Sequence, residues 1–274
     1  MEMSPIAARA FAGLLERATG QQLVPGRRWR IETALGPILR ARGIHTLDCL
    51  AAMVRGCDDS ALSDEVVEAL LNHETFFFRD SGTFQMIAKE ALPALAAQRQ
   101  ARRQLRIWSA GCSTGQETYS LALALARQPL GAEWDISILG TDISHQAVAR
   151  AREGMYSQFE IQRGLPIGDM LAFFEAEGES WRAASALRQR VSFRQHNLLD
   201  PPPPGRFDLV LCRNVLLYFS ANGRRAVLDR LAEAMAPDGM LVLGAGETML
   251  GQSDAFDANP ALRGVYRPSP EDAR

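Results

Sequence analysis

The sequence predicts an α/β protein, in which an open and mostly parallel sheet follows an all-helical N-terminal region. Residues 107–125 (IWSAGCSTGQETYSLALAL) run from a short apolar strand through a glycine turn into a helix. Residues 207–212 (FDLVLC) form an apolar run typical of a strand buried on both faces. Residues 5–88, by contrast, carry helical patterns separated by glycines.

The N-terminal third is expected to form helices that end at glycines. Three helices are predicted at residues 6–18, 27–42 and 47–55, and a fourth begins near 63–65. The apolar stripe of the second helix consists of Ile31, Leu35 and Ile38 or Leu39. We expect a helical domain of residues 1–88, followed by a linker helix that is interrupted at Pro93 and reaches about residue 104.

Residues 105–274 are expected to form the α/β domain. A strand at 136–142 and a crossover helix at 145–153 follow the glycine turn. The stretch from about 157 to 190 is too irregular for one helix, so we expect an insertion there. The remaining elements are predicted as strands at 191–195, 207–212 and 240–243, a helix at 224–235 and an antiparallel strand near 265–267.

Composition narrows the classes of function. The chain has 274 residues, 47% of them hydrophobic, and a formal net charge of −2, so nothing global indicates a nucleic-acid partner. The four cysteines form no C-x-x-C pair, and we expect neither a metal site nor a disulfide framework. The N-terminus lacks a signal-peptide pattern, and no apolar run approaches the ~18 residues of a membrane span. We expect a cytoplasmic protein without membrane insertion.

The glycine turn predicts a ligand site. Ligands bind at the carboxyl edge of such a sheet, where Gly111 and Gly115 allow a close approach of the backbone. Asp142 ends the second strand, 27 residues after Gly115, and its carboxylate suits ribose hydroxyls. The glycines do not follow G-x-G-x-x-G, and Glu117 would repel a pyrophosphate at the helix N-terminus. The pattern indicates a nucleoside without phosphates, and S-adenosylmethionine fits because Glu117 can accept from its amino group.

Two other catalytic patterns match parts of the sequence. Gly111 to Gly115 also match the G-x-S-x-G nucleophile elbow of α/β-hydrolases, with Ser113 as the nucleophile. That fold requires an oxyanion loop upstream, which the sequence lacks, and a histidine downstream, whereas His145 and His196 lie beside predicted strand ends. The pair His73-Glu74 lacks the second histidine of a zinc protease motif.

Four motifs together resemble the CheR-type chemotaxis receptor glutamate O-methyltransferases. They are HETFFFRD (73–80), WSAGCSTGQETYSLAL (108–123), LGTDIS (139–144) and the pair HNLLD and FDLVLCRNVLLYF (196–200 and 207–219). The resemblance covers nearly the whole chain. It implies a Rossmann-like S-adenosylmethionine-dependent methyltransferase sheet with a small inserted β-subdomain, preceded by an all-α domain.

The resemblance also implies site residues. The cofactor-binding residues carried over by position are His73, Thr75, Arg79, Glu117, Asp142, Asn197, Leu198, Arg213 and Asn214. Many relatives have Asn where His73 stands, and Gln116 replaces a commoner Glu. Arg79 and Tyr218 resemble residues beside the transferred methyl group and are our catalytic candidates. A plain structural interpretation would instead make Arg79 an ion-pair partner of Asp80 and Tyr218 a core residue.

The activity that the resemblance implies is methylation of glutamate carboxylates on chemoreceptor cytoplasmic domains, with S-adenosylhomocysteine as the second product. We expect a monomer whose partner is the chemoreceptor. The densest basic element is the second helix, so we expect the receptor to dock on Arg27, Arg28, Arg30, Arg40 and Arg42, although a solvated basic face is about as compatible with the pattern. A catalytically silent S-adenosylmethionine-binding module is the alternative from another class of function.

Overall fold

The computed structural model describes residues 3–23, 28–56, 60–249 and 251–270, and leaves the side chain of Arg28 undescribed. The chain divides into two compact units, one of residues Met1–Asn72 with Tyr218–Gly223 and one of His73–Leu217 with Arg224–Arg274. Within the described residues, no helix combines the length and apolar character needed to cross a bilayer.

The first unit is helical, which confirms the predicted all-helical N-terminal region. Its helices are α1 (Pro5–Thr19), α2 (Arg28–Arg42), α3 (Leu47–Gly56) and α4 (Ser60–Leu70). Ser4 caps α1 by accepting from the Ala7 N–H, and Gly20 ends the helix in the left-handed region at φ 75°. One side chain from each helix is fully buried: Phe11, Leu35, Leu50 and Leu62. Ile31, Leu35, Ile38 and Leu39 are all buried, so the predicted apolar stripe of α2 is its buried face.

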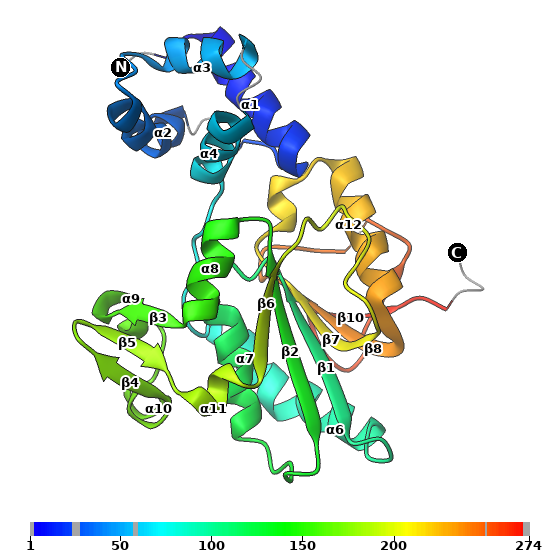
Figure 1. Cartoon of the computed structure of the whole chain (residues 1–274). Coiled ribbons are helices and arrows are strands. Elements are labelled where there is room, and N and C mark those ends of the chain that lie inside the picture. The colour runs from blue at the N-terminus through cyan, green and yellow to red at the C-terminus, as the bar shows by residue number, and fades with distance from the viewer. Residues whose placement is uncertain (1–2, 24–27, 57–59, 250, 271–274) are drawn as a thin grey trace. The chain divides into compact units, whose positions relative to one another are not determined.

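The second unit contains the sheet, whose strand order is β6-β2-β1-β7-β8-β10-β9. The strands are β1 (Gln104–Ala110), β2 (Asp135–Asp142), β6 (Val191–Gln195), β7 (Phe207–Cys212), β8 (Met235–Leu243), β9 (Phe256–Ala258) and β10 (Val265–Pro268). The first five pair in parallel, and β10 runs antiparallel to both β8 and β9. Figure 1 shows the strand ends meeting at one edge. The predicted α/β class and antiparallel last strand are confirmed.

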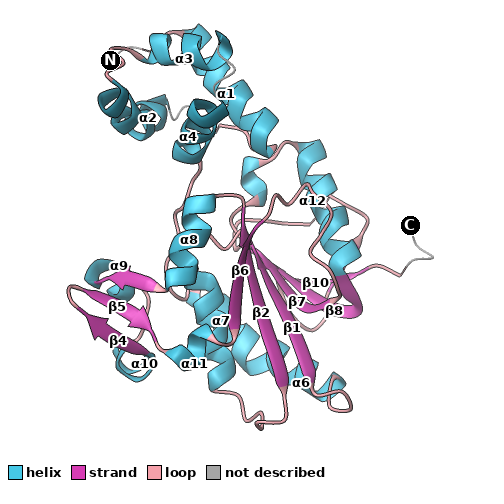
Figure 2. Ribbon diagram, in the orientation of Figure 1, coloured by secondary structure: helices cyan, strands magenta, loops and turns pink. Residues whose placement is uncertain are grey.

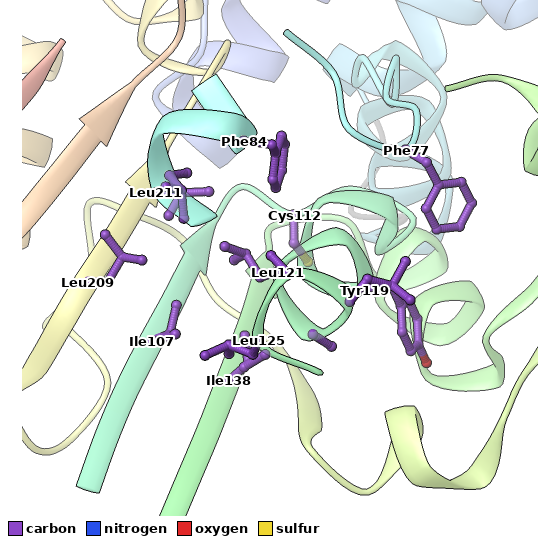
Figure 3. Packing of buried hydrophobic residues seen from close by; sticks show 14 of the residues in the cluster. Phe77, Phe84, Ile107, Cys112, Tyr119, Leu121, Leu125, Ile138, Leu209 and Leu211 are labelled. Atoms are coloured by element: carbon purple, nitrogen blue, oxygen red, sulfur yellow. The ribbon is translucent and has the colours of Figure 1, made fainter. Parts of the chain in front are cut away.

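Helices cover both faces of this sheet (Figure 2). They are α5 (Ser81–Met86), the π-helical segment η1 (Ile87–Ala91), α6 (Leu92–Gln98), α7 (Gln116–Ala126), α8 (His145–Glu153) and α12 (Ala221–Ala234). In Figure 3, Leu121 and Leu125 of α7 lie against Ile107 of β1 and Ile138 of β2. Every residue from Thr118 to Leu125 is buried, so α7 is a core element of this unit.

The insertion forms a second, three-stranded sheet with the order β3-β5-β4. Its strands are β3 (Met155–Ser157), β4 (Phe174–Glu177) and β5 (Ser180–Ala183), and its helices are α9 (Gln158–Gln162), α10 (Ile167–Phe173) and α11 (Ser185–Arg188). Ser157 and Glu160 form a capping box at the start of α9. The inserted subdomain therefore begins at β3, directly after the glycine that ends α8.

The division between the units falls at Asn72, earlier than the predicted boundary near residue 88. The cause is the burial of Phe77 and Phe84 in the core of the second unit. Phe77 packs edge-on against Tyr156 and Phe174 of the inserted subdomain, with ring centroids 5.0 and 5.5 Å away. Residues 73–88 therefore belong by packing to the second unit, and the predicted linker helix consists of α5, η1 and α6.

Candidate active site

The loop between β1 and α7 is held in a strained, tightly bonded form. Gly111, Ser113 and Gly115 have φ values of 84°, 50° and 95°. The N–H groups of Gly111 and Cys112 both donate to the carbonyl of Thr141 at 2.8 Å, which joins the loop to the end of β2. A Cβ at Gly115 would lie 2.9 Å from that of Ala151 in α8, so glycine is required there for packing as well as for conformation. Glycine therefore allows both the turn and the close packing of this loop against α8.

Asp142 lies at the end of β2, as predicted, and is oriented by main-chain donors. Its Oδ2 accepts from the N–H of Ser113 at 2.7 Å, and its Oδ1 accepts from the N–H of Ser144 at 3.0 Å. The geometry thus presents an oriented acceptor beside the glycine loop.

The segment 196–200 joins the same end of β2. The N–H of His196 donates to the carbonyl of Asp142 at 2.9 Å. Oδ1 of Asn197 accepts from the N–H of Leu199 at 3.1 Å, which turns the chain and orients the amide N–H₂ group of Asn197. Leu198 is buried. Burial lowers the pKa of His196, whose ring lies 6.0 Å from that of Trp108, against a raising effect of Asp200. The predicted pair Asn197 and Leu198 therefore adjoins Asp142.

Glu117 in the first turn of α7 is held by a buried cation. Its Oε1 accepts from the hydroxyl of Ser109 at 2.8 Å and its Oε2 accepts from Nη1 of Arg213 at 2.9 Å. The Arg213 side chain is 1% exposed and also pairs with Asp80 at 2.8 Å, while Nη2 donates to the carbonyl of Arg79 at 2.7 Å. Arg213 therefore compensates two carboxylates and fixes the main chain at Arg79.

Arg79 does not pair with Asp80. Its Nη1 donates to the carbonyl of Glu74 at 2.9 Å, and its Cζ lies 5.9 Å from the centroid of the Phe76 ring. Among the described residues Arg79 makes no ion pair, since Arg213 takes the Asp80 carboxylate instead. A half-buried guanidinium therefore retains donors for an anionic partner.

The segment 73–80 is bonded to the glycine loop and to α7. The hydroxyl of Ser113 donates to the carbonyl of His73 at 2.9 Å, and the N–H of Phe78 donates to the hydroxyl of Ser120 at 3.0 Å. His73 and Thr75 are half-buried on this segment. The Ser113 hydroxyl is thus engaged with a carbonyl rather than with an imidazole, which removes the geometry that the hydrolase alternative needs.

Cys112, in the loop between β1 and α7, is buried, and its thiol stays protonated. Burial raises the pKa of its thiol well above the ordinary value, and the charges of Asp142 and Glu117 raise it further. The thiolate is therefore disfavoured, and a cysteine nucleophile at this loop is not supported.

Glu247 is a residue of the site that sequence reasoning missed. Its Oε2 accepts from the N–H groups of Asn214 and Gly244 at 2.8 and 2.9 Å, and its Oε1 accepts from that of Leu216 at 3.0 Å. It thereby ties the loop after β8 to the loop after β7, where Asn214 has a φ of 58°. A Cβ at Gly244 would meet Oε2 at 2.7 Å. The sequence signal was the acid that closes GAGE directly after a strand.

All nine predicted cofactor residues belong to the second unit. For eight of them a specific contact or burial is described above, and the ninth, Thr75, lies between His73 and Arg79 in sequence. The predicted catalytic residue Tyr218 belongs to the other unit, at the end of the 3-10 turn η2 (Leu216–Tyr218).

The predicted docking arginines also lie in the helical unit. Arg27 and the side chain of Arg28 fall outside the described residues. Arg30 donates to Asn72 Oδ1 at 3.0 Å, and Arg42 pairs with Glu65 at 2.8 Å. Arg40 is exposed. Two of the predicted docking arginines therefore have hydrogen-bond or ion-pair partners within their own unit.

The residues at the edge fit a nucleoside cofactor with an amino group. The carboxylate of Asp142 suits ribose hydroxyls, and the carboxylate of Glu117 suits a cation. At Gly111 and Gly115 an added Cβ would meet Val215 at 3.3 Å and Ala151 at 2.9 Å, so the loop requires glycine at both positions for its packing. Within the described ranges, no group of three or more His, Cys, Asp and Glu side chains could hold a metal ion.

This combination of parallel sheet, glycine loop and strand-end acid defines a nucleoside-binding α/β domain. The chain belongs to the CheR methyltransferase family, since residues 73–265 match the family's SAM-binding domain. The predicted family, enzyme class and cofactor are thereby confirmed.

Relatives match over almost the full length. A protein from Pseudomonas putida named chemotaxis protein methyltransferase Cher2 is 34% identical over 261 residues, which are 93% of this chain and 94% of the relative. Chemotaxis protein methyltransferase 1 of Pseudomonas aeruginosa is 35% identical over 94% of this chain and 96% of its own. A chemotaxis protein methyltransferase of Vibrio parahaemolyticus is 34% identical over 94% and 95%.

Proposed function

We propose that this enzyme transfers a methyl group from S-adenosylmethionine to glutamate carboxylates on the cytoplasmic domains of chemoreceptors, forming glutamyl methyl esters. The observation that carries the proposal is the division of labour between two arginines. Arg213 compensates both Glu117 and Asp80, whereas Arg79 makes no ion pair among the described residues. Relatives named chemotaxis protein methyltransferases support a methyl transfer that serves chemotaxis.

The chemistry requires little acid–base catalysis. A glutamate carboxylate has an ordinary pKa of about 4.3 and is ionised near neutrality, so no general base is needed. When bound, S-adenosylmethionine supplies a methyl group on a cationic sulfur. The protein contributes orientation and exclusion of water, because the two reacting charges neutralise each other in an in-line displacement.

The cofactor residues hold the donor by complementary polar groups. We assign the ribose hydroxyls to Asp142 and the amino group to Glu117. His73, Thr75, Asn197, Leu198 and Asn214 complete the assigned cofactor contacts. Arg213, which was predicted to contact the cofactor, acts through Glu117, because its Nη1 and Nη2 donors are directed to Glu117, Asp80 and the Arg79 carbonyl.

Arg79 and Tyr218 are the proposed catalytic residues. A guanidinium with unused donors can bind a carboxylate through two parallel hydrogen bonds. Replacement of Arg79 by lysine should therefore lower kcat much as alanine does, because an ammonium group cannot reproduce that fork. Normal turnover of the lysine variant would contradict this role.

We propose that the receptor docks on α2 through its exposed basic face, and that the enzyme acts as a monomer in the cytoplasm. Of the described arginines on that face, Arg40 is the one to test, because Arg30 and Arg42 have partners within the unit. Arg40→Glu should raise the receptor KM at low salt and flatten its salt dependence, since exposed charges are screened beyond about 8 Å at physiological ionic strength. The matched control is Arg55→Glu on α3, which also replaces an exposed arginine. Equal KM values for the two variants would refute docking on α2.

The decisive test of the proposed function is incubation with methyl-labelled S-adenosylmethionine and chemoreceptor cytoplasmic fragments. A base-labile label on receptor glutamates is the expected result. A base-stable label would identify another acceptor, and cofactor binding without any transfer would favour the silent-module alternative.

A further inference from the structure

Tyr218 is fixed through its main chain to the segment that follows α1. The carbonyl of Tyr218 accepts from the N–H of Gln22 at 2.6 Å. The next residue, Phe219, is buried and forms an antiparallel bridge with Gln21. Although Tyr218 follows the β7 loop in sequence, its backbone is therefore held by the helical unit.

The side chain of Tyr218 is held by a relay from α2. Nη2 of Arg30 donates to Oδ1 of Asn72 at 3.0 Å, and Nδ2 of Asn72 donates to the phenolic oxygen of Tyr218. All three residues are half-buried. They lie far apart in sequence, so only the fold of the helical unit brings them together.

The chemistry of these groups fixes the direction of each hydrogen bond. A guanidinium carries donors and no acceptor, so it must face the amide oxygen of Asn72. The amide nitrogen then faces the phenol and can only donate, and the phenolic oxygen of Tyr218 is consequently an acceptor in this contact. The phenol proton remains available to a second partner. A charge-assisted bond at one end of an amide also strengthens the donor at its other end.

We propose that Arg30 and Asn72 are positioning residues that set the Tyr218 phenol as a hydrogen-bond donor to the acceptor carboxylate. This inference rests on the proposed function and extends it, because it adds two positioning residues to the proposed catalytic pair. Arg30, which was predicted as a receptor-docking residue from its charge, is thereby given a positioning role instead.

The test is a double-mutant cycle on kcat. Tyr218→Phe removes the phenol, and Asn72→Ala removes the donor that orients it. Asn72→Ala should lower kcat about two- to tenfold, the range for one hydrogen bond, and should change the S-adenosylmethionine KM little. In the Tyr218→Phe background, Asn72→Ala should have no further effect on kcat, because the group that it positions is already gone.

Three further variants of the relay sharpen the cycle. Arg30→Met should reproduce the loss of Asn72→Ala, whereas Arg30→Lys should largely restore kcat because an ammonium still donates to the amide oxygen. Asn72→Asp should lower kcat at least as far as Tyr218→Phe. A carboxylate beside the phenol accepts a hydrogen bond from the phenol O–H, so this O–H can no longer donate to the acceptor carboxylate. Thr33→Ala, an exposed change on the same helix, is the matched control and should leave kcat unchanged.

The outcomes separate the relay from the proposed function. If Tyr218→Phe retains wild-type kcat, the catalytic role of Tyr218 fails and the relay fails with it. If Tyr218→Phe is slow but Asn72→Ala is normal, or slows the reaction equally in both backgrounds, the relay is overturned while the proposed function stands. Urea denaturation of each variant identifies a loss of kcat that comes from unfolding.

Discussion

Two acids at the same edge of the sheet are held by different kinds of partner. Asp142 is oriented by the N–H groups of Ser113 and Ser144, which are neutral main-chain donors. Glu117 is oriented by Arg213, whose buried charge also serves Asp80. In the first arrangement neutral donors orient the carboxylate, and in the second the carboxylate belongs to a charged network around a buried arginine. The two acids, both proposed to bind the cofactor, should therefore differ in their contribution to stability.

The largest effect should follow from breaking the charged network. Arg213→Met should lower the free energy of unfolding by about 3 to 5 kcal/mol, because it leaves Glu117, with a side chain 12% exposed, and Asp80 without their cation. Urea denaturation measures the loss. Arg230→Met is the matched control, since Arg230 is an exposed partner of Glu233 and its removal should cost less than about 1 kcal/mol. Similar losses in the two variants would show that Arg213 is not a structural brace.

An intermediate effect is expected at Glu247, which resembles Asp142 in serving main-chain donors. Glu247→Gln should lower the free energy of unfolding by about 1 to 2 kcal/mol, because an amide nitrogen then faces the N–H groups of Asn214 and Gly244. Cofactor affinity should fall as well, since the β7 loop loses its brace. Glu175→Gln on the exposed strand β4 serves as the control. Unchanged stability and affinity in Glu247→Gln would mean that the loop holds itself.

The smallest effect concerns pH on the Asp142 side. Burial lowers the pKa of His196 below its ordinary value, so the unfolded chain binds a proton before the folded chain does. The stability associated with neutral His196 is thus fully present above pH 6.5 and is lost as pH falls through the lowered folded pKa. His196→Gln should make the urea midpoint less sensitive to pH between about 5 and 7. Parallel curves for variant and wild type would remove His196 from the acid response.

Sequence reasoning located elements best where a local signal marks both ends. The helix at 145–153 and the strands at 191–195 and 207–212 were predicted with the bounds that the structure shows. Ser144 caps that helix and Gly154 ends it, and both are visible in the sequence. The strand β8, in contrast, starts at Met235 rather than at 240, because a register irregularity against β7 carries Pro237 to Gly239 within the strand.

The sequence predicted the chemical character of the site better than the contacts that hold its residues in place. Asp142 and Glu117 stood out because an acid at a strand end or in a first helical turn is a local pattern. The role of Arg213 as a brace, the main-chain contacts of Glu247 and the attachment of Tyr218 to the helical unit depend on contacts between residues 33 to 146 positions apart. No spacing in the sequence encodes such pairs, and they follow from the packing of the folded chain.

The central claim is that Asp142 and Glu117 bind S-adenosylmethionine, and calorimetric titration of the wild type, Asp142→Ala and Glu117→Ala tests it most directly. Each variant should bind roughly tenfold to a hundredfold more weakly, because each loses a charged acceptor worth about 1.5 to 3 kcal/mol. Glu233→Ala, which removes an exposed acid on α12, should keep the wild-type Kd. Wild-type affinity in both Asp142→Ala and Glu117→Ala would contradict the claim.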